Sequence, residues 1–233
     1  MQPIKRALER MDIFAWRTPP RGAHLFADLK KSLPRLNVAT IFDVGANVGQ
    51  SVEKYLQAFP AAAIHSFEPI PATFAVLSKR FGTHPNVRLH QVALGSESGT
   101  ARMSVEGTSD VFRISDGGTE EVPVSTIDLF DIERISFMKV DAEGYDLEVM
   151  KGAVGKLRGQ QIDVVQVEVG MHPQNDLHVR FEDMKGFMEQ NGMKLFSIFE
   201  QSPFYAPPSP SMYRADAVFI SNAMVSLHQN QPR

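Results

Sequence analysis

The chain contains no cysteine and no long apolar run. The absence of cysteine excludes disulfide bonds, thiolate catalysis and cysteine-ligated zinc, and an intracellular compartment is the simplest assumption for such a chain. Because no long apolar run or signal-peptide core is present, no stable membrane anchor is expected. We therefore expect a cytoplasmic protein.

The sequence also lacks a strong charge of either sign. Its 24 Lys and Arg residues nearly balance 27 Asp and Glu residues, which gives a formal net charge of −3. This balance gives no reason to expect nucleic acid as a partner. The 233 residues, of which 43% are hydrophobic and 22% charged, are enough for one enzyme-sized domain with a substantial core.

What is present is an apolar strand that runs into a glycine turn, GANVG at residues 45–49. Gly45 and Gly49 permit positive φ and let a ligand approach the backbone closely. The free N–H groups at the start of the following helix favour a polar or anionic ligand end. The GxxxG spacing differs from the GxGxxG of dinucleotide sites, and no Gly-Lys-Ser/Thr follows, so pyrophosphate is not the expected ligand.

Carboxylates end the first two strands of this pattern. Asp43 ends the first strand, and Glu68 ends the second. Asp43 would repel a pyrophosphate but suits a cationic ammonium or sulfonium group, and Glu68 suits hydrogen bonds from ribose hydroxyls. The structural alternative is that Asp43 caps the helix and Glu68 is a solvated strand end. Both acids lie at the expected sheet edge, which favours a nucleoside site.

From residue 38 onward, strand and helix patterns alternate as in a mostly parallel sheet. After the third strand, two extended segments replace the expected crossover helix and predict an extra β-hairpin. The last two strands follow each other without a helix, which predicts one antiparallel strand near the edge. The expected fold is therefore α/β and Rossmann-like, with seven strands and helices on both faces. Strands are predicted at residues 40–44, 62–68, 87–94, 135–140, 162–169, 194–198 and 215–220, the hairpin at 100–105 and 121–125, and helices at 24–33, 48–59, 74–81, 147–157 and 181–190.

The predicted organisation has three parts. Residues 1–37 form an N-terminal helical segment, residues 38–222 form the ligand-binding domain, and residues 223–233 form a flexible tail. Within the domain, the polar stretch 106–120 and the Pro- and aromatic-rich stretch 201–214 are interpreted as loops.

Four motifs follow one another along the domain. They are DVGANVG at residues 43–49, FEP at 67–69, VALG at 92–95 before the hairpin, and KVDAEGYD at 139–146. Together they resemble the FkbM family of class I S-adenosylmethionine-dependent methyltransferases over residues 40–169. The resemblance implies the methyltransferase fold, S-adenosyl-L-methionine as cofactor, and methylation of hydroxyl oxygens on sugars or polyketide-type metabolites, among others.

The resemblance also implies which residues form the cofactor site. The turn at residues 45–49 would hold the methionine end, Asp43 would face its ammonium group, and Glu68 would bind the ribose. The backbone near Val92 and Ala93 would contact the adenine edge. The cofactor-binding residues expected from it are Asp43, Gly45, Ala46, Asn47, Gly49, Glu68, Pro69, Val92, Ala93 and Asp141.

Methylation of a hydroxyl requires a group that takes its proton. Four candidates lie at the carboxyl ends of the strands, where the ligand crevice forms. We expect Asp141 to point inward, and Glu143 to orient the acceptor or stabilise the turn, because one of the two can cap the next helix. Glu168 lies in an apolar strand, so it is near the strand mouth or paired. His172 has the pKa best matched to neutral pH, and the alternative is a loop histidine bonded to backbone.

No metal is assigned, since the Asp-Asp or Asp-Asn pair typical of catechol-type methyltransferases is missing after Val167. Two rival functions stay open: an NAD-dependent oxidoreductase, supported by Glu68 lying 19 residues after Gly49 (68 − 49), and a non-catalytic binding protein. The expected partner is a small-molecule or glycan acceptor, with a saccharide, glycoconjugate or secondary-metabolite hydroxyl favoured. Its contacts are expected in the N-terminal helices and in the stretches 106–120 and 201–214. No sequence feature distinguishes a monomer from a dimer.

Overall fold

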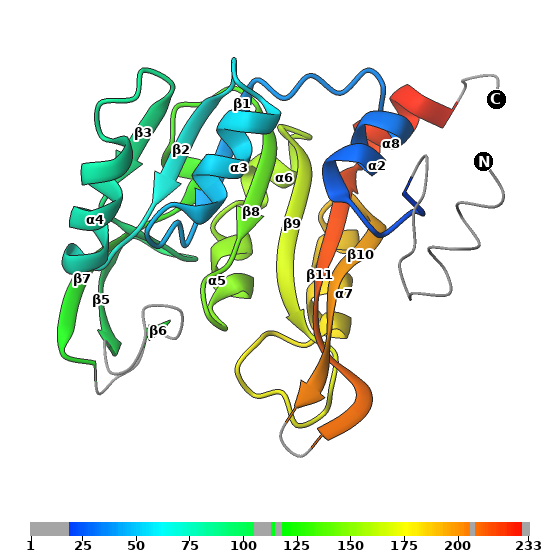
Figure 1. Ribbon diagram of the computed structural model, residues 1–233. Helices are drawn as coiled ribbons and strands as arrows, with labels where there is room; N and C mark the ends of the chain where they lie inside the picture. Colours follow the sequence, from blue (N-terminus) through cyan, green and yellow to red (C-terminus); the bar gives the residue numbers. More distant parts are fainter. Residues whose placement is uncertain (1–18, 105–112, 115–117, 206–207, 230–233) are drawn as a thin grey trace, which may run out of the picture.

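The structure, a computed structural model, describes residues 19–104, 113–114, 118–205 and 208–229. Its centre is a seven-stranded sheet with the order β10-β11-β9-β8-β1-β2-β3 (Figure 1). Neighbouring strands pair in parallel except for β11, which is antiparallel to both β9 and β10. The predicted α/β class, with its reversed strand next to the edge, is confirmed. The strands span Thr40–Val44 (β1), Ala63–Phe67 (β2), Val87–His90 (β3), Ile135–Val140 (β8), Ile162–Gly170 (β9), Met193–Tyr205 (β10) and Pro208–Ser221 (β11).

Helices cover both faces of this sheet because the central strands are apolar on both sides. On one face, Leu29, Val52 and Leu77 pack with Ile41 and Phe137. The other face is covered by a second cluster that contains Met138, Val149, Leu157, Met184 and Met188. The helices are α2 (Leu25–Ser32), α3 (Gln50–Ala58), α4 (Pro71–Phe81) and α8 (Asn222–Gln229) on the first face, and α5 (Asp146–Lys151), α6 (Val154–Arg158) and α7 (Phe181–Gln190) on the second.

A second, four-stranded sheet begins after β3, in place of the crossover helix whose pattern is missing from the sequence. Its order is β4-β7-β5-β6, and β5 pairs antiparallel with β7, as the hairpin prediction requires. One detail differs from the prediction, since residues 93–94 do not continue β3 but pair in parallel with β7. The elements are β4 (Ala93–Leu94), β5 (Gly99–Ser104), β6 (Arg113–Ile114), β7 (Glu120–Ser125) and the short 3-10 helix η2 (Ile127–Leu129).

The helix predicted over residues 147–157 is divided into α5 and α6 at Gly152. A Cβ at Gly152 would lie 2.0 Å from the carbonyl oxygen of Gly95, and the Gly152 carbonyl accepts a hydrogen bond from the Asp128 N–H at 2.9 Å. The backbone at Gly152 therefore packs closely against the second sheet. The helical repeat in the sequence does not reveal this contact.

The C-terminal part is more regular than the sequence predicts. Residues 201–205 and 208–214, part of the stretch interpreted as a loop, extend β10 and β11 into a long hairpin arm with several register shifts, seen at the bottom of Figure 1. A flexible tail is expected from residue 223, but residues 222–229 form α8. The Ser221 hydroxyl accepts the Met224 N–H at 3.1 Å, Met224 is buried, and the Arg35 N–H donates to His228 Nε2 at 3.2 Å.

Several expectations fall outside the described residues. They include the part of the N-terminal helical segment before residue 19 and most of the stretch 106–120. In the part of the chain that the structure describes, no helix has both the length and the apolar character needed to cross a membrane.

Candidate active site

The turn between β1 and α3 needs glycine at two positions for different reasons. Gly45 has a φ of +76°, and a Cβ there would lie 1.9 Å from the carbonyl oxygen of Asp141. The N–H groups of Gly45 and Ala46 both donate to the Phe67 carbonyl, at 3.1 and 3.0 Å. Gly49, with a φ of +92°, precedes α3, and a Cβ there would lie 2.3 Å from the Phe81 ring. Gly45 therefore lets the ends of β1 and β8 meet, whereas Gly49 lets α3 pack on α4.

Glu68 connects this turn to the end of β2. One carboxylate oxygen accepts the Asn47 N–H at 3.1 Å, and the other accepts the Ile70 N–H at 2.9 Å. The residue is only 6% exposed, and burial raises the pKa of its carboxyl group although the two N–H groups oppose the shift. Glu68 is therefore not the solvated strand end of the structural alternative, and each oxygen keeps a further lone pair for a ligand hydroxyl.

Asp43 lies beneath the turn and is completely buried. Neither of its carboxylate oxygens has a hydrogen-bond partner among the described residues, so it does not cap α3. Burial raises its pKa from 3.8 to about 6, against the attraction of Lys139 and with a further upward contribution from Asp141, while the nearby Ser51 side chain opposes the rise. A buried carboxylate with so few polar partners is unfavourable unless a cationic group compensates for it.

Lys139 and Asp141 form an ion pair at the end of β8. The Lys139 ammonium lies 2.7 Å from Asp141 Oδ2, and both side chains are partly buried. Burial alone would lower the pKa of Lys139, but the carboxylates of Asp141 and Asp43 outweigh it and raise the pKa above its ordinary value. Lys139 is a site residue that sequence reasoning missed, although it lies two residues before Asp141 and so shares its face of the strand.

The turn after β8 is closed by another missed residue. Asp146 accepts the N–H groups of Ala142 and Gly144 at 2.9 and 3.1 Å, so neither Asp141 nor Glu143 performs this role. Glu143 has a φ of +48° and Gly144 a φ of +89°. The position of Asp146 in the first turn of α5 was the available signal.

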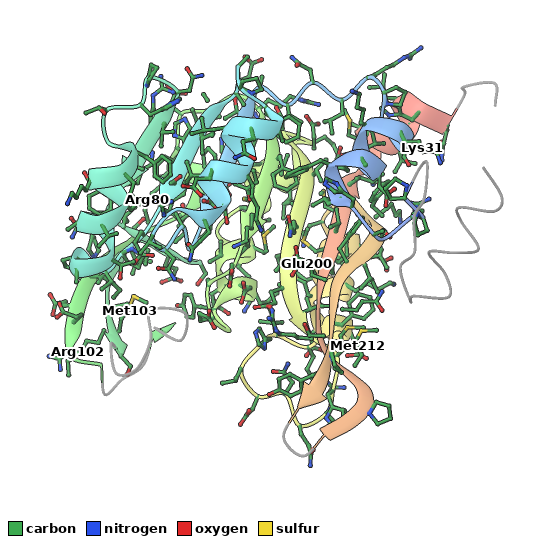
Figure 2. The ribbon with its side chains drawn as sticks, in the orientation of Figure 1. Lys31, Arg80, Arg102, Met103, Glu200 and Met212 are labelled. Carbon is green, nitrogen blue, oxygen red and sulfur yellow. The ribbon has the colours of Figure 1, made fainter. Side chains whose placement is uncertain are left out.

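These elements enclose a cavity of about 330 Å³, here called the smaller cavity. Met103 of β5 and Glu200 of β10 line it from opposite sides (Figure 2). The structure brings the predicted cofactor residues to its wall except Asp43, which lies beneath it, and Gly49, which packs on α4. The lining residues that the sequence predicted are Gly45, Ala46, Asn47, Glu68, Pro69, Val92, Ala93, Asp141 and Glu143.

Glu168 and His172 do not line the smaller cavity. Glu168 is paired, since one oxygen lies 2.9 Å from His178 Nε2 and the other contacts the Arg214 guanidinium. His172 lies in the loop after β9, where its Nδ1 accepts the Gln174 N–H at 3.2 Å and its ring is 6.4 Å from that of Tyr213. Their roles as bases stay predictions. Over the described ranges, no group of three or more His, Asp and Glu side chains is placed to hold a metal ion.

A family model for the methyltransferase FkbM domain matches residues 43–195. The chain belongs to this family. The match begins at Asp43 and includes the glycine turn, the acid after β2 and the Lys139 to Asp146 motif. The predicted family and its S-adenosylmethionine dependence are thereby confirmed.

Individual relatives agree with the family assignment. Methyltransferase 1 of Beauveria bassiana is 27% identical over 203 residues, which are 74% of this chain and 78% of that protein. The hexuronic acid methyltransferase AglP of Haloferax volcanii is 28% identical over 149 residues, 58% of each chain. A crystal structure of methyltransferase FkbM from Methylobacillus flagellatus has a TM-score of 0.53 at 15% identity, which shows the fold. That match covers 78% of this chain but only 43% of the solved one.

The residues of the smaller cavity fit S-adenosylmethionine. Gly45 keeps the floor free of a side chain where the methionine end would lie, and Asp43 and Asp141 supply negative charge toward its cationic groups. Glu68 would have lone pairs for the ribose hydroxyls, and Val92, Ala93 and Met103 would offer apolar contacts to the adenine.

Proposed function

We propose that the protein transfers a methyl group from S-adenosylmethionine to a hydroxyl oxygen of a saccharide, glycoconjugate or small secondary metabolite. The observation that carries this proposal is the Lys139–Asp141 pair, which places the Asp141 carboxyl group on the wall of the smaller cavity. A carboxylate can accept the proton of a hydroxyl, whereas it repels an acceptor that is itself a carboxylate. The relative named a hexuronic acid methyltransferase supports the saccharide class.

The bound cofactor supplies a methyl carbon on a cationic sulfur, and transfer forms the O–C bond while the C–S electron pair returns to sulfur. Asp141 takes the hydroxyl proton in this scheme. Lys139 fixes the direction of the Asp141 side chain through the 2.7 Å contact. Glu143 lines the same cavity and orients the acceptor. Holding the acceptor oxygen in line with the breaking bond supplies much of the acceleration. We assign this activity to a domain of residues 38–222 that follows an N-terminal helical segment of residues 1–37.

Titration calorimetry with S-adenosylhomocysteine and, separately, NAD tests the cofactor. We expect S-adenosylhomocysteine alone to bind, and Glu68→Ala and Asp43→Ala to weaken it, because Glu68 holds the Asn47 turn and Asp43 supplies the buried charge. Binding of NAD instead would favour the oxidoreductase alternative.

Turnover needs a separate experiment, since cofactor binding alone also fits a non-catalytic protein. Neutral glycosides and phenolic metabolites are incubated with the protein and S-adenosylmethionine, and mass spectrometry detects replacement of a hydroxyl hydrogen by methyl. Methylated product that disappears in Asp141→Asn supports the proposal. Cofactor binding with no methylation in a broad acceptor panel would instead favour the binding protein.

A further inference from the structure

A second cavity of about 1040 Å³, here called the larger cavity, lies between α2 and α3. Both helices are on the same face of the sheet (Figure 1). Its floor is formed by three polar residues on three strands, Lys139 of β8, Gln166 of β9 and Asp216 of β11. A polar floor is unusual on a sheet face that otherwise packs against helices.

The larger cavity adjoins the smaller one. Ser51, Lys54, Lys139 and Glu200 line both of them. Glu200, labelled in Figure 2, has a φ of +44° at an irregular point of β10. A molecule in the larger cavity therefore contacts the same Lys139 that holds Asp141 at the cofactor side.

The polar floor begins where an apolar row ends. Ile41, Phe137 and Val164 are cross-strand partners that form a buried row on this face. Two residues further along the strands, on the same face, the corresponding row contains Lys139 and Gln166. The sheet face therefore changes from core to polar surface beneath the larger cavity.

Asp216 is the buried acid of this floor, only 8% exposed. Gln166 Nε2 donates a hydrogen bond to one of its carboxylate oxygens. Burial raises the pKa of Asp216, Gln166 and Lys139 oppose the rise, and Glu200 and Asp141 add to it. Asp216 is unfavourable for folding where it stands, which is typical of a group retained for binding.

We propose that the larger cavity is the acceptor site, in which Asp216 and Gln166 hydrogen-bond the hydroxyl groups of an uncharged, polyhydroxylated acceptor. This inference rests on the proposed function and names its substrate class. The reacting hydroxyl would extend past Lys139 toward Asp141. Because Lys139 is already paired with Asp141, and the carboxylates of Asp216 and Glu200 are balanced by Lys30 and Lys54, the lining has no net charge to compensate for the desolvation of an acidic sugar's carboxylate. The ring of Phe59, which is partly exposed, lines the same cavity and offers a surface for the C–H face of a sugar, whereas Tyr55 and Phe199 are buried.

The test is calorimetric binding of p-nitrophenyl hexosides and the matching p-nitrophenyl hexuronides to protein saturated with S-adenosylhomocysteine. We expect a hexoside to bind about tenfold more tightly than its hexuronide. Asp216→Asn should weaken hexoside binding about tenfold and reduce the discrimination against hexuronides, because it removes a charged acceptor. Gln166→Met should also weaken the hexoside, since it removes the hydrogen bond that fixes Asp216.

The matched control is Asp163→Asn. Asp163 is also a buried aspartate of the sheet, but it pairs with Arg134 and lines neither cavity. It should change hexoside affinity by less than about twofold. Unchanged S-adenosylhomocysteine affinity in all variants shows that each has folded.

The outcomes separate the inference from the proposed function. If the protein binds S-adenosylhomocysteine but prefers the hexuronide, binds neither glycoside, or binds hexosides equally well after Asp216→Asn, the acceptor inference is wrong and the cofactor site stands. If S-adenosylhomocysteine itself does not bind to the wild-type protein, the proposed function fails first.

Discussion

The two cavities are built in different ways. The smaller cavity depends on backbone geometry: Gly45 at positive φ, and Glu68 bound to two backbone N–H groups. The larger cavity depends on the side chains of Lys139, Gln166 and Asp216, which come from three strands. A cavity built from backbone requires particular residues at fixed spacing and so leaves a motif, whereas one built from side chains across a sheet leaves none. Substitutions should therefore affect the two cavities differently.

The largest effect is expected for Gly45→Ala. Its Cβ would lie 1.9 Å from the Asp141 carbonyl oxygen, and its φ of +76° is unfavourable for alanine. We expect the free energy of unfolding to fall by on the order of 3 kcal/mol or more and S-adenosylhomocysteine binding to be lost. Urea unfolding and calorimetry measure the two effects.

Gly186→Ala is the matched control. A Cβ at Gly186, within α7, meets nothing within 4 Å. Because alanine has the higher helix propensity, this variant should be more stable by up to about 1 kcal/mol with unchanged cofactor affinity. Equal losses in both glycine variants would contradict a backbone-built smaller cavity.

The second effect is on the catalytic rate and not on the stability of the fold. Asp141→Asn keeps the size of the side chain but removes the charge that Lys139 holds at 2.7 Å. We expect kcat to fall about 100-fold or more, close to 3 kcal/mol, with a smaller change in S-adenosylhomocysteine affinity. Glu148→Gln, in the following helix α5 and paired with Lys151, is the control. Unchanged turnover in Asp141→Asn would show that another residue is the base.

Local sequence patterns predicted the helices and strands whose structure depends on residues within the same segment. The alternation and apolar run of β1 and β8 and the helical repeat of α7 gave bounds that agree with Thr40–Val44, Ile135–Val140 and Phe181–Gln190. The motifs around Gly45 and Glu68 are also local patterns, and their residues line the smaller cavity. The hairpin arm of β10 and β11 was missed because its prolines and irregular register hide the strand pattern.

Contacts between distant strands could not be predicted. Gln166 meets Asp216 only because β11 inserts between β9 and β10 and runs antiparallel to both. No local feature of Ala215-Asp216-Ala217 shows that its carboxylate lies on the floor of a cavity. The pairing of Glu168 with His178 and Arg214 likewise depends on a register that the sequence does not reveal.

The third effect is a pH dependence caused by Asp43. Its folded-state pKa is about 6 against an ordinary value of 3.8, so the folded protein binds the extra proton between these values. Stability should therefore fall as pH rises from about 4 to 6, by up to about 3 kcal/mol from this group. In Asp43→Asn this loss should be absent. Urea unfolding at several pH values measures how the free energy of unfolding changes with pH in the wild-type protein and in Asp43→Asn. Equal slopes in the two proteins would contradict the raised pKa of Asp43.

The fourth effect has the opposite sign and comes from the other end of the smaller cavity. His65 stacks between Phe42 and His90, with ring centroids 5.1 and 5.3 Å away, and His90 stacks on Phe67 of the cavity wall. Burial, with His90 and Arg88 adding to it, lowers the pKa of His65 from 6.5 to about 4. The unfolded chain therefore binds more protons between these values, and stability from His65 is lost as pH falls from about 6.5 to 4.

His65→Phe keeps the stack without the titrating group, so its melting temperature should rise relative to that of the wild-type protein as the pH falls from 6.5 to 4. Because the Asp43 and His65 contributions oppose each other in the same pH range, the wild-type profile should be flatter than either effect alone. Asp43→Asn should then show the steeper acid loss that His65 causes, and His65→Phe the gain on acidification that Asp43 causes. Two variants whose slopes change in the same direction would show that one of the two assignments is wrong.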